Sequence, residues 1–242
     1  MNDFKFIIMA GGTYDKWNGE IKHLVKVKGE PLVARTIRLL RECGIEDISI
    51  STNHPGFENM GVPILTHTNE YRLGVDQDYG NWLDAFYPIT EPTCFMFGDV
   101  VFSKEAVQKI VETDVDDIMF FASAPPFADT YTKPWAEPFA YKVVDIPLFF
   151  ESIEKAKIHE KEGRFYRKPV SWELWQEIKG TPLGEIDYTN PIVHEMANPA
   201  YGVSIRPNEI LNDALQAQND PQQRKDFFAK SLNVYTNAIK AW

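Results

Sequence analysis

The alternation of short apolar runs with helical patterns limits the folds open to this chain more than any other feature. Apolar runs expected to contain strands occupy residues 4–9, 45–51, 62–67, 93–102 and 117–124. Between two of them, Val33, Ile37 and Leu40 recur at helical intervals. Strands that alternate with helices build a mainly parallel sheet with helices on both faces. We therefore predict an α/β fold, a single Rossmann-like domain whose mainly parallel, mixed sheet is flanked by helices.

Signals at helix ends support this reading. Pro31 fits the first position of a helix over residues 31–43, and Gly44 fits its stop. Ser103 is expected to cap the next helix, with Glu105 in its first turn. A further helix is expected to begin in the segment NWLDAFYPI, residues 81–89.

The second half of the chain differs in composition from the first. Residues 126–242 are rich in aromatic residues and proline, and helical patterns run from about Pro207 to Trp242. We find no internal repeat and no low-complexity linker, and 242 residues of which 44% are hydrophobic suffice for one sizeable core. We interpret residues 1–242 as one domain whose second half is a substrate-binding extension. Its aromatic residues would also support a homodimer.

The charge of the chain narrows its partners. A formal net charge of −10 lacks the basic field that attracts a phosphate backbone, so nucleic acid is not expected as a partner. The sequence shows no signal peptide and no apolar span of about twenty residues, so no membrane partner is expected and the cytoplasm is the expected compartment. Cys43 and Cys94 have no metal or redox spacing and are expected to be buried free thiols.

The stretch MAGGTYDKW follows the first apolar run directly. A glycine at the end of a strand lets the backbone approach an anion closely, and successive backbone amides can form a concave anion site. The stretch is neither a Walker loop, because no GK[ST] follows, nor a dinucleotide fingerprint, which needs three spaced glycines. The glycines alone leave a phosphate loop and a plain turn equally open.

Three motifs together make a family resemblance specific. The sequence has A-G-G at residues 10–12, I-K-H-L at 21–24 and G-E-P-L-V at 29–33, each after the expected spacing. It resembles the nucleotidyltransferases with a GT-A-like fold, which couple an NTP to a sugar phosphate or a related phosphorylated metabolite. The resemblance covers residues 4–125 well, and it implies that these form the nucleotide-binding part and residues 126–242 the acceptor-binding part.

The resemblance assigns roles at the N-terminal motif. It implies that Ala10, Gly11 and Gly12 line the nucleotide and that Lys22 is catalytic, stabilising charge on the phosphates. The family loop often reads G-x-G-x-R, whereas this chain has Thr13 and Asp15 at those positions and Ile21 in place of a proline. Lys16, next to the missing arginine, is a second catalytic candidate that would replace its charge.

A G-D pair after a buried strand is the second anchor of the resemblance. Asp99 stands where family members bind the divalent metal that bridges the triphosphate, which implies Mg²⁺ as the cofactor. Asp187 is a candidate for a second metal ligand. The alternative for Asp99, an aspartate that only ends a strand and binds no metal, stays open.

Four further positions are candidates on the same resemblance. Gly80 and Asn81 match a segment that lies against the base and ribose, and Asn81 would either cap a helix or bind the nucleotide. Glu137 and Lys142 match a later segment that lies over the acceptor, although structural roles are equally open for both.

A basic cluster in GRFYRKP offers a site for the acceptor's phosphate. Arg164 and Arg167, with Lys168 beside them, present guanidinium groups whose geometry matches phosphate oxygens. A solvated basic loop is the alternative.

The resemblance implies a metal-dependent nucleotidyltransferase. An acceptor phosphate would attack the α-phosphorus of an NTP, CTP before UTP, and pyrophosphate would leave, in the synthesis of surface or capsule polysaccharide precursors. One alternative is a glycosyltransferase of the same fold, against which Asp99-Val100-Val101 lacks the second aspartate of D-x-D. The other is a non-catalytic nucleotide-binding module, which the altered loop favours.

Overall fold

The computed structural model describes residues 4–11, 21–27, 29–66, 82–123, 137–166, 168–186 and 202–204, and the account below concerns these. The helices are α1 (Leu32–Glu42), α3 (Lys104–Glu112), α4 (Ile146–Lys161) and α5 (Ser171–Ile178). The strands are β1 (Lys5–Met9), β2 (Lys26–Val27), β3 (Glu30–Pro31), β4 (Ile48–Ser51), β5 (Ile64–Leu65), β6 (Thr93–Phe97), β7 (Val100–Phe102), β8 (Ile118–Ser123), β9 (Glu137–Val143) and β10 (Gly202–Ser204). Short 3₁₀ turns are η2 (Lys22–Leu24), η3 (Pro55–Phe57), η4 (Trp82–Ala85) and η5 (Leu183–Glu185).

Six strands form the central sheet in the order β5-β4-β1-β6-β9-β8. β1 pairs in parallel with β4 and with β6, and β4 pairs in parallel with β5. β9 runs antiparallel to both of its neighbours, β6 and β8. The predicted α/β fold with a mainly parallel, mixed sheet is therefore confirmed.

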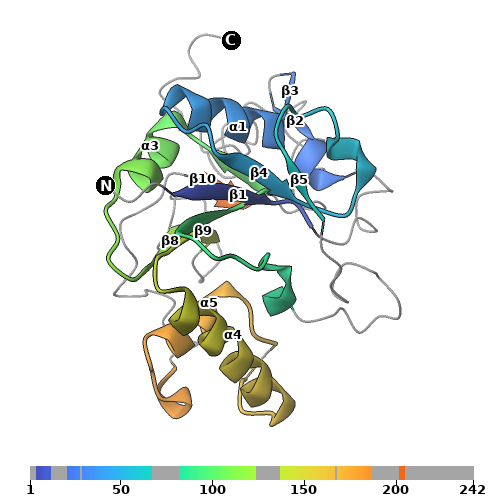
Figure 1. Ribbon diagram of the computed structural model, residues 1–242. Coiled ribbons are helices and arrows are strands. Elements are labelled where there is room, and N and C mark those ends of the chain that lie inside the picture. The colour runs from blue at the N-terminus through green and yellow to red at the C-terminus, as the bar shows by residue number, and fades with distance from the viewer. Residues whose placement is uncertain are drawn as a thin grey trace, which may run out of the picture.

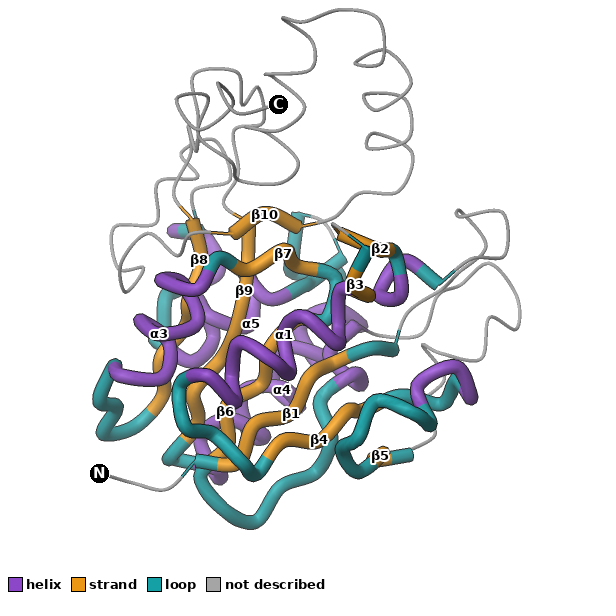
Figure 2. Tube along the Cα trace, turned by 90° about the horizontal axis from the view of Figure 1, so that it is seen from above, coloured by secondary structure: helices purple, strands orange, loops and turns teal. Residues whose placement is uncertain are grey.

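Helices cover both faces of this sheet, as Figure 1 shows: α1 and α3 lie on one side of it, and α4 and α5 on the other. In the view from above, α1 and α3 run next to each other over the strands (Figure 2). On the other face Phe149 of α4 stacks on Phe95 of β6, with ring centroids 5.9 Å apart. Because both faces are covered, β4 and β6 are buried along their whole length. For β6 this confirms the buried strand predicted within residues 93–102.

The expected helix ends are largely found. The Oγ of Ser103 accepts a hydrogen bond from the backbone N–H of Ala106 over 3.1 Å, so the predicted cap of α3 is confirmed. Pro31 precedes α1 by one residue, because it belongs to β3 and pairs with Lys26. Gly44 follows α1 with a φ of 82°, a conformation that a glycine adopts without strain.

One local prediction differs from the structure. The helix expected to begin in residues 81–89 is only the 3₁₀ turn η4, because Pro88 lacks an N–H and disfavours helical backbone at Tyr87. The segment 93–102 is two strands, β6 and β7, separated by a turn at Gly98 and Asp99. The expected C-terminal helices from Pro207 lie outside the described residues.

The two cysteines have different surroundings. Cys94 is fully buried in β6 and is a free thiol, as predicted, and burial raises its pKa to about 12. Cys43 is also free but only partly buried, since it lies at the end of α1. Among the helices that the structure describes, none has the length and apolar character needed to span a membrane.

Candidate functional site

The carboxyl ends of β1 and β6 lie side by side. The two strands pair in parallel up to Met9 and Phe97, and the backbone N–H of Gly98 then donates a hydrogen bond to the carbonyl of Met9 over 2.9 Å. Ala10 and Gly11 follow one strand, and Asp99 follows the other. Ligands of open α/β sheets bind beyond the carboxyl ends of the strands. The two sequence anchors, far apart in the chain, thus meet at the edge where a ligand is expected.

Gly98 has no room for a side chain. A Cβ at this position would lie 2.6 Å from the carbonyl oxygen of Met9 and 3.1 Å from Cδ2 of His23. The first of these atoms is backbone and cannot turn away. The glycine of the G-D pair is therefore required for the close packing of β1, β6 and the segment around His23.

Thr52 fixes the start of the glycine loop from the other side. Its buried hydroxyl donates to the carbonyl of Ala10 over 3.0 Å and accepts from the backbone N–H of His54 over 3.2 Å. The N–H of Ala10 donates in turn to the carbonyl of Ser51 over 2.9 Å. Ala10 is fully buried, so its backbone leaves β1 in one fixed direction.

The short turn η2 carries Lys22 to the same edge. His23, the next residue, has only 2% of its surface exposed and packs its ring against Gly98. The ring also meets Phe57 edge-on, with centroids 6.4 Å apart. The backbone at Lys22 is thereby placed next to the turn that carries Asp99.

Sequence reasoning did not select His23, Thr52 or Phe57. The only sequence signal for Thr52 was a polar residue directly after a buried strand, at the edge where functional side chains gather. His23 and Phe57 are separated by more than thirty residues in the chain, and their contact follows from the tertiary fold.

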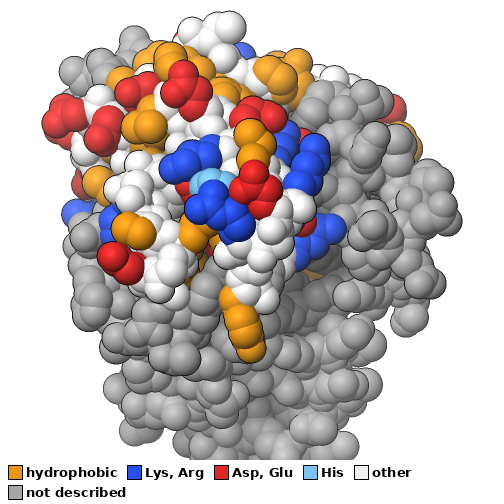
Figure 3. Space-filling view, turned by 90° about the horizontal axis from the view of Figure 1, so that it is seen from below, with side chains coloured by type: hydrophobic (Ala, Val, Ile, Leu, Met, Phe, Trp, Pro, Cys, Tyr) orange, Lys and Arg blue, Asp and Glu red, His pale blue; other side chains and the backbone are white. Residues whose placement is uncertain are grey.

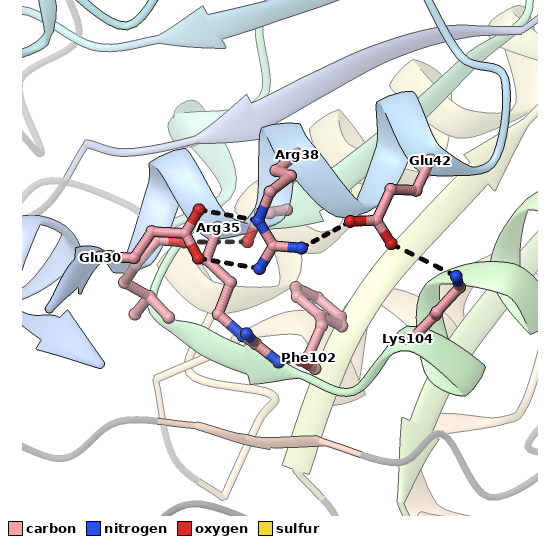
Figure 4. A network of polar contacts seen from close by, with 8 residues as sticks. Glu30, Arg35, Arg38, Glu42, Phe102 and Lys104 are labelled. Carbon is pink, nitrogen blue, oxygen red and sulfur yellow. Dashed lines mark hydrogen bonds and ion pairs between the residues drawn. The ribbon is translucent and has the colours of Figure 1, made fainter. Parts of the chain in front are cut away.

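Asp99 lies in the turn between β6 and β7 and is partly buried. The strand after it is held from two sides: β10 pairs with β7, and Arg35 of α1 donates through Nη2 to the carbonyl of Phe102 over 3.4 Å (Figure 4). In the part of the chain that the structure describes, no three histidine, cysteine or acidic residues form a group able to hold a metal. Of the two predicted metal ligands, Asp99 is the one that lies within the described residues.

A network of charged residues joins α1 to its neighbours beside this edge. Arg38 donates from Nε and Nη2 to the carboxylate of Glu30 over 2.9 and 2.8 Å, and from Nη1 to Glu42 over 2.6 Å. Glu42 also meets Lys104 of α3 at 3.3 Å (Figure 4). The hydrogen bonds from Arg38 lower the pKa of Glu30. These residues tie β3, α1 and α3 together on the surface.

The structure places Lys142 away from the candidate site. Its ammonium donates to the carbonyls of Val111 and Thr113 over 3.0 and 2.6 Å, at the end of α3, and lies 4.5 Å from the centre of the Phe4 ring. Lys142 pairs with Cys94 near the start of β6, which is the opposite end of that strand from Asp99. Burial lowers the pKa of this lysine. These contacts favour the structural role that the sequence left open for Lys142, in which its ammonium satisfies carbonyls at the end of a helix.

Glu137 and Arg164 occupy different places. Glu137 begins β9 and pairs with Ser123, the last residue of β8, so its backbone is at the carboxyl-end edge. Arg164 follows α4 and meets Glu162 at 3.4 Å on the surface. Their proposed contacts with the acceptor stay predictions.

The face on the α4 and α5 side carries many charges. Figure 3 shows lysine and arginine side chains around a histidine on this face, with acidic side chains among them. His159 and Lys155 of α4 both contact the buried carboxylate of Glu177 in α5, at 2.5 and 2.9 Å. These contacts link two helices, which indicates a structural role.

The remaining predicted site residues lie outside the described residues. They are Gly12, Lys16, Gly80, Asn81, Arg167 and Asp187.

Comparison with known proteins gives a family. The family model of the MobA-like NTP transferase domain matches residues 6–170. No curated protein sequence matches the chain significantly. Similar solved structures include the inositol-1-phosphate CTP transferase from T. maritima, at 15% identity and a TM-score of 0.46, covering 75% of this chain and 84% of that chain. Another is the CTP:phosphocholine cytidylyltransferase from Streptococcus pneumoniae, at 17% identity and a TM-score of 0.45, covering 89% of this chain and all of that one (100%).

Proposed function

The chain belongs to the MobA-like NTP transferase family, and from this premise we propose that it couples CTP, or else UTP, to a phosphorylated small metabolite with release of pyrophosphate. One observation carries the proposal. The backbone after β1, the turn at Asp99 and the turn η2 with Lys22 are packed together at one edge through Gly98 and His23. This arrangement supports a site that holds a triphosphate.

The reaction asks little covalent chemistry of the protein. An acceptor phosphate is already a nucleophile, so the protein has to position it and to neutralise charge while the α-phosphorus changes partners. The backbone of Ala10, Gly11 and Gly12 would approach the nucleotide, since glycines allow close contact with phosphate oxygens. Lys22 would bring a positive charge to the α-phosphate, with Lys16 as a second cation.

Asp99 is suited to be a ligand of Mg²⁺. Mg²⁺ keeps several waters and is commonly bound by one or two carboxylates together with substrate phosphates. One partly buried carboxylate beside a proposed triphosphate site meets that need, with Asp187 as the second candidate. When bound, the ion would neutralise charge on the triphosphate. Asp99 itself would hold the ion at the end of β6, close to the glycine backbone.

The acceptor is proposed to be a sugar phosphate, a polyol phosphate or a similar compound. Glu137 is a candidate for contacts with its hydroxyl groups, because β9 begins at the nucleotide edge. Arg164 and Arg167 are candidates for its phosphate. Gly80 and Asn81 remain candidates for the base and ribose. The preference for CTP and the role in surface polysaccharide synthesis rest on the sequence resemblance.

The decisive experiment measures pyrophosphate release from each of the four NTPs with Mg²⁺, against a panel of sugar, polyol and amino-alcohol phosphates. Release with CTP and one acceptor is the expected result. Lys22→Ala and Asp99→Asn should each abolish most of it. Lys26→Ala, which alters an exposed lysine of β2, is the matched control and should retain it.

Other outcomes would replace the proposal. Tight NTP binding without pyrophosphate release from any pair would identify a binding module. Transfer of a sugar from a nucleotide sugar would identify a glycosyltransferase. Full turnover by Lys22→Ala would overturn the assigned mechanism.

A further inference from the structure

We propose that His23 is a positioning residue: its ring sets the place of Lys22 relative to Asp99, and it does so through its contact with Gly98. The inference deepens the proposed function and rests on it for the roles of Lys22 and Asp99. The contact itself is independent of that function.

The first argument is the fit of the imidazole ring against Gly98. The ring is 98% removed from solvent, given its 2% exposure, and its Cδ2 lies so near Gly98 that a Cβ there would be 3.1 Å away. Gly98 is in turn held to β1 by its hydrogen bond to Met9. The ring therefore packs on backbone that cannot retreat.

The second argument is the support behind the ring. Phe57 of η3 is fully buried and meets the His23 ring edge-on. His54 packs edge-on against the same phenyl ring, with centroids 6.3 Å apart. Because interiors are close-packed, a buried ring in contact with both Phe57 and Gly98 has one position. His23 is thus held by the end of β6 and by η3.

The third argument is where the two ends of the contact lie in the sequence. His23 directly follows Lys22, and Gly98 directly precedes Asp99. Consecutive Cα atoms are about 3.8 Å apart, so a shift between His23 and Gly98 passes directly to the two neighbours. Misplacement of catalytic groups by about 1 Å can lower a rate by about 100-fold. The packing of this one ring therefore controls a distance on which the chemistry depends.

Two substitutions separate positioning from general stability. His23→Ala removes the ring, whereas His23→Asn keeps a planar group with atoms where Nδ1 and Cδ2 lie. His159→Ala is the matched control, since it removes another buried imidazole, one that contacts Glu177 between α4 and α5.

Amide hydrogen exchange tests the contact without any turnover. In His23→Ala the amides of residues 21–25 and 97–99 should exchange at least about tenfold faster, while those of β1 remain protected, because local opening is confined to loosened contacts. His159→Ala should leave the exchange of residues 97–99 unchanged. Equal acceleration across the whole sheet, or none at 97–99, would overturn the proposal.

Kinetics tests the consequence. In His23→Ala, kcat should fall by about 10- to 100-fold with a smaller change in the KM for NTP, and His23→Asn should recover most of the loss. An unchanged kcat in His23→Ala would overturn the positioning role. A wild-type protein that releases no pyrophosphate would instead refute the proposed function, and hydrogen exchange would still decide whether His23 holds the two segments together.

Discussion

The carbonyl oxygen of Met9 accepts a hydrogen bond from the backbone of Gly98 and would lie 2.6 Å from any Cβ at that residue. The same atom thus joins the strand before the glycine loop to the strand before Asp99 and excludes every side chain from the junction. Both segments that are proposed to bind the nucleotide depend on this junction, so its disturbance should affect binding as well as stability.

Gly98→Ala tests the junction directly. The added methyl must displace backbone, and overpacking of this kind costs about 1–3 kcal/mol. We expect a lower midpoint of urea unfolding and NTP binding weakened by more than about tenfold, measured by calorimetric titration. Gly184→Ala is the control, because a Cβ there would meet nothing within 4 Å. Equal affinities for the two variants would contradict the close packing.

Thr52→Val removes one hydroxyl and keeps the shape of the side chain. The carbonyl of Ala10 and the N–H of His54 would each lose a partner, at a cost of about 1–3 kcal/mol. We expect lower stability together with a raised KM for NTP. Thr36→Val is the control: its buried hydroxyl donates to the carbonyl of Leu32 within α1 and not to the glycine loop, so it should affect stability alone. A KM that is unchanged in Thr52→Val would show that this hydroxyl does not shape the site.

Lys142→Met tests whether Lys142 has a structural role at the end of α3. The two carbonyls at the end of α3 would lose their donor, so we expect a loss of about 1–3 kcal/mol in the free energy of unfolding. The KM for the acceptor and kcat should stay unchanged, because Lys142 lies at the other end of β6. A raised acceptor KM with unaltered stability would restore the original prediction of an acceptor contact.

The thiol of Cys94 should make stability depend on alkaline pH. Burial raises its pKa from 9.0 to about 12, so between these values the folded chain keeps a proton that the unfolded chain has released. By linkage the free energy of unfolding falls as pH rises through this window. Urea unfolding at pH 8 and pH 10.5 should show a larger decrease for the wild type than for Cys94→Ala. An identical pH dependence would show that Cys94 titrates freely in the fold.

The strands and helix caps were accessible from the sequence because they depend on neighbouring residues. Ser103 accepts a hydrogen bond from the N–H of the residue three positions later, so this cap depends only on local sequence. The strands β1, β4 and β6 are buried on both faces, and here too local pattern and structure agree. The direction of β9 was not accessible, since an apolar pattern is the same in a parallel and an antiparallel strand.

The candidate site could be predicted from the sequence only where a motif marks it. Gly11 and Asp99 follow strand ends in recognisable motifs, and the structure brings their segments together. The contacts of Lys142 could not be predicted from the sequence, because its partners lie about thirty residues away in the chain, at the end of α3, and meet it only through tertiary packing. His23 was passed over because a polar residue in a loop gives no local sign that it will be buried.

Because β9 runs in the reverse direction, the two halves of the chain meet at one edge of the sheet. β1 and β6 end at this edge, whereas β9 begins there, at Glu137, and runs toward Lys142 at the opposite edge. The far end is anchored to α3, so sequence changes just before Glu137 need not disturb the registers of the sheet. On the proposed function, selection for a new acceptor can therefore act at the start of β9 while the half that is proposed to hold the nucleotide is inherited intact.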